Sequence, residues 1–151
     1  MATADGFHPD FDETKQQPAT NRVHHVKASE ITSDTAQSEG LRRFAALSGR
    51  SVGAEKLWMG ETHASPESAS ANHHHGESET AIYVRSGNPE FVFHDGVQEV
   101  RIKAQPGDYV FIPPSLPHRE ENPDPDNRAE VVIARSSQEA IVVNLPELYP
   151  L

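Results

Sequence analysis

The chain has 151 residues, a length that suits one domain of ordinary size. Thirteen Lys and Arg residues against 23 Asp and Glu residues give a net charge of −10 with His neutral, and a surface of that sign repels nucleic acid. Cysteine is absent, which excludes disulfides, thiolate nucleophiles and iron–sulfur clusters and leaves N and O atoms as metal ligands. No apolar run reaches the roughly 18 residues of a membrane span, and the N-terminus lacks the basic and apolar regions of an export signal. We therefore expect a cytoplasmic protein with neither a nucleic-acid nor a membrane partner.

The N-terminal segment, residues 1–20, is rich in Asp, Glu, Thr, Gln and Pro and is expected to form a flexible arm. From residue 21 to 151, short apolar runs separated by turn residues predict one all-β domain. The predicted strands are 23–28, 41–47, 54–62, 71–75, 80–85, 90–94, 97–103, 109–112, 118–122, 129–135 and 140–144. Residues 41–47 fit a short helix as well as a strand. A two-residue Asp95-Gly96 loop predicts a hairpin between 90–94 and 97–103.

About ten short strands must close into a barrel or sandwich to limit exposed strand edges. Such a fold offers one interior pocket. It also keeps at least one open edge, and the arm carries two phenylalanines, Phe7 and Phe11, with no evident partner in their own chain. We therefore predict a homodimer.

Histidine is unusually frequent, with nine residues, three of them consecutive. On a strand, His73 and His75 project from the same face and His74 from the other. Glu79 lies four residues beyond His75, and His118 opens a later strand after a proline-rich turn. Three neutral imidazoles and a carboxylate converging in a barrel form a mixed N and O site that suits Mn, Fe, Ni, Co or Zn as a divalent ion.

These residues carry a resemblance to a known family. The cupin family's first motif, Gly-x5-His-x-His-x3–4-Glu-x6-Gly, is similar to a stretch that supplies His73, His75, Glu79 and Gly87. Its second motif, Gly-x5-Pro-x-Gly-x2-His-x3-Asn, is similar to a stretch that supplies Gly107, Pro113, His118 and Asn122. The chain thus resembles a small single-domain cupin over residues 66–122, and more loosely the small bacterial cupins described as similar to mannose-6-phosphate isomerase. The resemblance implies a double-stranded β-helix, or jelly-roll barrel, with His73, His75, Glu79 and His118 as metal ligands.

Three positions depart from the family pattern. Glu67 and Ser115 replace motif glycines, at turns where other residues serve if φ stays negative. Seven residues, not six, separate Glu79 from Gly87, and a one-residue change of register sends a side chain to the opposite face. A β-bulge near Thr80 would restore Glu79 to the interior. We predict that Glu79, rather than Thr80, completes the metal shell, because a neutral Thr would leave the ion uncompensated.

Alternation from Glu79 then turns Tyr83 and Arg85 inward, and alternation from His118 turns Glu120 inward. Tyr83 and Glu120 are the candidate catalytic residues for proton transfer, and Arg85 is a candidate partner for an anionic substrate. Packing in the core for Tyr83 and at the rim for Arg85 is the competing interpretation.

The function predicted for such a site is binding and transformation of a small organic molecule. Isomerase, lyase and dioxygenase chemistry all stay open, because the metal is not identified by its ligands alone. Two further interpretations stay open as well: a non-catalytic cupin that binds a small molecule or sugar, and a barrel in which the metal serves only stability.

Overall fold

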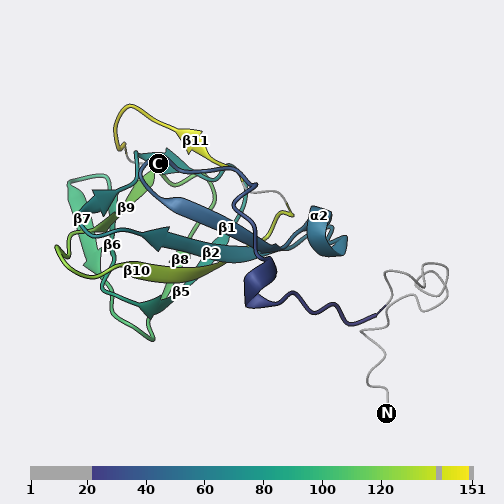
Figure 1. Cartoon of the computed structure of the whole chain (residues 1–151). Coiled ribbons are helices and arrows are strands. Elements are labelled where there is room, and N and C mark those ends of the chain that lie inside the picture. Colours follow the sequence, from purple (N-terminus) through teal and green to yellow (C-terminus); the bar gives the residue numbers. More distant parts are fainter. Residues whose placement is uncertain (1–21, 139–140, 150–151) are drawn as a thin grey trace, which may run out of the picture.

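The computed structural model describes residues 22–138 and 141–149, and the predicted arm of residues 1–20 lies outside them. The regular secondary structure of the described chain is almost entirely strand, arranged in two antiparallel sheets (Figure 1). The predicted all-β class with a jelly-roll barrel is confirmed.

The first sheet has the order β1-β2-β10-β5-β8. Its strands are β1 (Arg42–Leu47), β2 (Trp58–Ala64), β10 (Ala129–Arg135), β5 (Thr80–Ser86) and β8 (Tyr109–Ile112). The second sheet has the order β11-β4-β9-β6-β7, with β3 also paired to β9. Its strands are β11 (Val143–Asn144), β4 (His73–His74), β9 (His118–Asn122), β6 (Glu90–His94), β7 (Glu99–Lys103) and β3 (Ser68–Ala69). Neighbours such as β2 and β10 are far apart in the chain, and this interleaving brings residues from distant motifs into one interior.

Two short helical turns accompany the sheets, η2 (Ala28–Glu30) and α2 (Gly49–Val52). The strand predicted at 23–28 does not form, and the chain enters η2 instead, whose first turn is closed by the Glu30 carboxylate accepting from the Lys27 N–H at 3.0 Å. Residues 42–47 form a strand rather than the alternative helix. The apolar run therefore continues the sheet beside β2, and α2 begins only after the Ser48 cap.

The β6–β7 hairpin is confirmed, but its loop has four residues, Asp95 to Gln98, rather than two. The carboxylate of Asp95 accepts hydrogen bonds from the N–H groups of Val97 and Gln98 at 2.8 and 2.9 Å. These bonds close the loop, and β7 begins at Glu99.

Strict alternation of buried and accessible residues along β2, β5 and β10 separates an inner from an outer face. The apolar part of the inner faces forms the core, which is centred on Trp58, Ile82, Val84, Phe91 and Ile133. The remaining inner positions are polar, and all of the residues discussed below as the site come from that polar part.

The two replaced motif glycines keep the backbone conformation of glycine. Glu67 has a φ of 56° and Ser115 a φ of 59°, so the condition that φ stays negative is not met at either turn. A left-handed conformation costs a residue with a side chain roughly 1–2 kcal/mol. At Ser115 the cost is offset by hydrogen bonds, because both its N–H and its hydroxyl donate to the Gly76 carbonyl, at 2.6 and 3.1 Å.

No helix in the described part of the chain is long and apolar enough to cross a membrane.

Candidate metal centre

Three buried histidines meet between the sheets. His73 lies on β4, His75 just after it, and His118 at the start of β9, where it is directly opposite His73 across the strand pair. One ring nitrogen from each lies within 4.8 Å of the others. The ring centroids are 4.5 to 5.1 Å apart. The structure thus brings the histidines of both motifs to one point.

The main chain fixes the orientation of all three rings. The Nδ1 atom of each ring contacts a backbone carbonyl oxygen, and since a carbonyl only accepts, Nδ1–H is the donor. The acceptors are Ala71, Leu116 and Ile141, at 2.8 Å from His73, 2.9 Å from His118 and 2.7 Å from His75. In a neutral ring this leaves the lone pair on Nε2, which is the arrangement found in histidines that bind metals.

Burial keeps the three rings neutral. It lowers the pKa of His73 from 6.5 to about 4 and also lowers the pKa values of His75 and His118. The neighbouring rings act in the same direction at His73 and His75, because each would repel a second positive charge. The lone pairs are therefore available at neutral pH without prior loss of a proton.

We expect the metal-free protein to lose stability as the pH falls from about 6.5 towards about 4. In that interval a histidine is protonated in the unfolded chain but stays neutral when it is buried in the folded one. The free energy of unfolding therefore falls by about 1.4 kcal/mol per pH unit for each such histidine. Urea unfolding across that range, with EDTA present, measures the slope. His73→Gln should reduce the slope, and a flat wild-type profile would contradict the prediction.

The structure does not bring Glu79 to the histidines. Its side chain is exposed, and its backbone N–H donates to the Ser136 hydroxyl at 3.0 Å. Thr80 takes the inward position instead, buried and with no hydrogen-bond partner for its hydroxyl among the described residues. Thr80 is also the residue separated from Gly87 by six intervening residues, which is the final spacing of the motif.

The inward direction predicted for Tyr83 and Arg85 is wrong for the same reason. With Thr80 inward, Ile82 and Val84 follow it into the core, and the odd-numbered residues of β5 face out. Tyr83 is 38% exposed and packs against the ring of Tyr109, with centroids 5.1 Å apart. As placed here, neither Tyr83 nor Arg85 reaches the three histidines.

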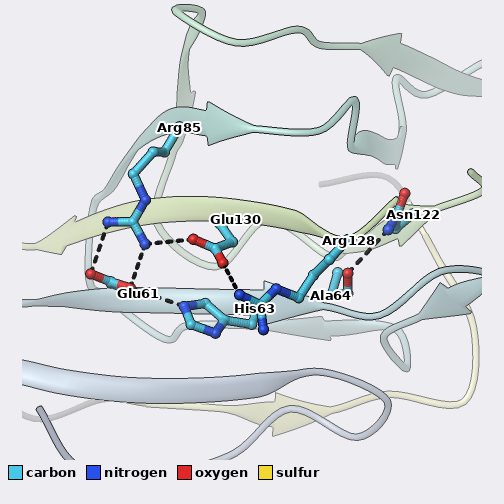
Figure 2. Close-up of polar contacts among 7 residues, drawn as sticks. All are labelled: Glu61, His63, Ala64, Arg85, Asn122, Arg128 and Glu130. Atoms are coloured by element: carbon cyan, nitrogen blue, oxygen red, sulfur yellow. Dashed lines mark hydrogen bonds and ion pairs between the residues drawn. The ribbon is translucent and has the colours of Figure 1, made fainter. Parts of the chain in front are cut away.

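Arg85 instead joins an ion-pair network on the outer face of the first sheet (Figure 2). Its guanidinium donates to Glu61 and to Glu130, and His63 contacts Glu61 at 2.9 Å. The hydrogen bonds from Arg85 lower the pKa of Glu61 to about 2. Glu61, His63 and Glu130 also lie close enough together to hold a metal ion. Arg85 and Arg128 already pair with the two carboxylates, however, and neutralise their charge.

Glu120 lies where alternation predicts, buried on the same face of β9 as His118. Among the described residues it is the one buried carboxylate. Its charge raises the pKa values of His73 and His118, although burial lowers both by more. A negative group thus faces the histidine cluster from close by.

Two buried arginines belong to this interior and were not predicted. Arg43 on β1 and Arg135 on β10 are each 1% exposed. Burial lowers the pKa of Arg135 to about 9, which still leaves it charged at neutral pH. A signal was present: Arg135 continues the period-two pattern of Ala129, Val131 and Ile133, which face the core.

A separate hollow of about 520 Å³ lies near α2, and Thr32, Ser48, Arg50, Trp58 and Gln138 are among its lining residues. None of the three histidines lines it. It is therefore not the metal position, although the Trp58 ring at its wall also lies beneath Arg135, 5.3 Å from the guanidinium carbon.

The donor set fits a divalent transition metal. The Nε2 atoms of His73 and His118 are buried without a hydrogen-bond partner, a costly state that coordination relieves. Metal sites that keep a position open for water or substrate commonly have three protein ligands, and three imidazoles are one such set.

Comparisons with known proteins agree with this geometry. The family model described as a cupin domain matches residues 60–134, while no curated protein matches the chain. Among solved structures, the polyketide cyclase RemF from Streptomyces resistomycificus is 20% identical, with a TM-score of 0.65 over 82% of this chain and 86% of that one. An S161A mutant of the Bacillus subtilis oxalate decarboxylase OxdC is 19% identical, with a TM-score of 0.63 over 74% of this chain and 30% of that one.

An oxalate oxidase in complex with the substrate analogue glycolate is 18% identical, with a TM-score of 0.66 over 82% of this chain and 63% of that one. This chain thus spans less than a third of the oxalate decarboxylase and under two thirds of the oxalate oxidase. At identities this low, the structural likeness shows a shared fold and no more. Together with the matched domain, the paired sheets and the three converging histidines, it places this chain in the cupin family.

Proposed function

We propose that this cupin binds one divalent transition metal through His73, His75 and His118 and uses it to bind and transform a small organic molecule. The observation that carries the proposal is the convergence of three imidazoles, each held through its Nδ1 by a backbone carbonyl. The related structures support a small organic substrate, since they are named as a decarboxylase and an oxidase of oxalate and a cyclase of polyketides.

A metal bound there supplies Lewis-acid polarisation of a substrate oxygen. The chain's own part is to hold the three imidazoles neutral and oriented, and to keep a proton-transfer group close. Glu120 is that group, because it is buried on the face of His118 and no side-chain hydrogen bond in the described structure engages its carboxylate. Such a carboxylate accepts a proton from a bound molecule or returns one to it.

Metal titration of the EDTA-treated protein tests the first half of the proposal. We expect about one equivalent of Co, Mn, Fe, Ni or Zn per chain by elemental analysis, since the described interior holds one three-histidine cluster. Glu79→Gln should leave the metal affinity unchanged, because that side chain is exposed. A large loss of affinity in this variant would move Glu79 back into the metal shell.

Turnover tests the second half. Metal-loaded protein assayed against a panel of small carbonyl, carboxylate and catechol compounds should convert at least one of them. Glu120→Gln should keep the metal and lose conversion. Metal binding without conversion of any compound would favour the non-catalytic binding module.

A further inference from the structure

We infer that the ligand of this centre is a small carboxylate, which lies between the metal and the guanidinium of Arg135 and is held by both. This inference rests on the proposed metal site and specifies the chemical class of what the site takes. Arg135 belongs to β10, outside both histidine motifs.

The position of Arg135 is the first argument. Its Nη2 atom lies 3.5 Å from Nε2 of His75, the atom that would ligate the metal. Its strand position is directly opposite Thr80, the inward residue of β5. The guanidinium therefore reaches the space next to the metal position from the opposite sheet.

The unfilled hydrogen-bonding capacity of Arg135 is the second argument. Its Nε and Nη1 atoms are buried and have no acceptor among the described residues. Arg43 differs, since its two terminal nitrogens donate to the Ala36 carbonyl and the Ser38 hydroxyl, both at 2.8 Å. The ring of Trp58 packs on the Arg135 guanidinium and holds its plane without accepting those N–H groups. A planar, immobilised guanidinium with free donors matches the geometry of a carboxylate.

The charge of the interior is the third argument. Among the described residues, the buried charged side chains are Arg43, Arg135 and Glu120, which leaves one positive charge in excess while the histidines are neutral. A divalent metal would add two more. Buried charge without compensation is strongly unfavourable, and a carboxylate between the metal and Arg135 reduces the excess while contacting both.

The test uses lactate and its uncharged amide, lactamide, as probes that differ in charge but hardly in size. Co(II)-loaded wild-type protein is titrated with each and followed by visible absorption of the metal and by calorimetry. We expect lactate to bind in preference to lactamide, and Arg135→Gln to weaken lactate binding roughly 10- to 100-fold, as expected for a lost charge-assisted hydrogen bond. Co(II) affinity should stay the same or rise in this variant, since a positive neighbour of His75 has been removed; a purely structural role would lower it.

Matched variants keep the test decisive. Arg128→Gln removes the same charge from the outer face, where Arg128 is 57% exposed, and should bind lactate as the wild type does. Arg135→Lys keeps the charge but loses the planar fork, and serves if the Gln variant does not fold; its lactate affinity should fall between the two. Equal binding of lactate and lactamide by the wild type, or undiminished lactate binding by the folded Arg135 variants, would overturn the inference. Failure of Co(II) to bind the wild type would instead refute the proposed function. In that case the role of Arg135 is tested without metal, by comparing the rise in Tm that lactate causes in the wild type and in the Arg135 variants.

Discussion

Replacing His118 with alanine should lower metal affinity at least about 100-fold, because it removes one of the three imidazoles that form the cluster. His118 is also the one ligand from the second sequence motif, so its loss leaves only two imidazoles from a single segment. The measurement is competitive titration of EDTA-treated protein with Co(II) or Zn(II), with circular dichroism to show that the barrel persists.

His74→Ala is the matched control. His74 sits between two ligands in sequence, yet it is half-buried on the opposite face, where its Nδ1 accepts from the Gly76 N–H at 2.9 Å. Its loss should leave metal affinity nearly unchanged. If both variants lost the metal equally, binding would belong to the histidine tract as a loose chelator and not to the site formed between β4 and β9.

Replacing Asn122 with alanine should destabilise the fold by about 3 kcal/mol or more, since several buried polar groups would lose their partner together. Asn122 is fully buried, and its amide donates to the carbonyls of Ala64, Ser65 and Asn127 at 2.9 to 3.1 Å (Figure 2 shows the bond to Ala64). These bonds tie the end of β9 to the end of β2 in the other sheet. Urea unfolding gives the free energy directly.

Asn144→Ala serves as the control for Asn122. Asn144 also lies on a strand, β11, but its side chain is exposed and no side-chain hydrogen bond of it is present in the described structure. It should change the free energy of unfolding by no more than about 0.5 kcal/mol. A loss at Asn122 no larger than at Asn144 would show that the closing motif residue has no stabilising role.

The register of β5 shows where sequence reasoning succeeded and where it failed. Two motif spacings disagree about which residue of this segment points inward. Three intervening residues after His75 select Glu79, whereas six intervening residues before Gly87 select Thr80. The structure follows the second, because Gly87 has a φ of 78° and an added Cβ there would lie 2.6 Å from the Ala129 Cα. That close approach fixes the end of β5 against β10 in the register that turns Thr80 inward.

The histidines were predictable for a different reason. Their placement needs only a spacing of two on one strand and a fixed distance from a stiff turn on another. The two arginines escaped prediction because a charged residue on a strand is normally assigned to the outer face, and only the completed pairing of the sheets shows Arg43 and Arg135 enclosed.

The carbonyl anchors of the three rings have a consequence for how this protein tolerates change. The groups that hold the imidazoles come from the main chain of Ala71, Leu116 and Ile141, not from their side chains. Substitution of the side chain at those three positions should leave each acceptor oxygen in place. The orientation of the three imidazoles should therefore survive changes of side chain at Ala71, Leu116 and Ile141, provided that the local backbone keeps its course.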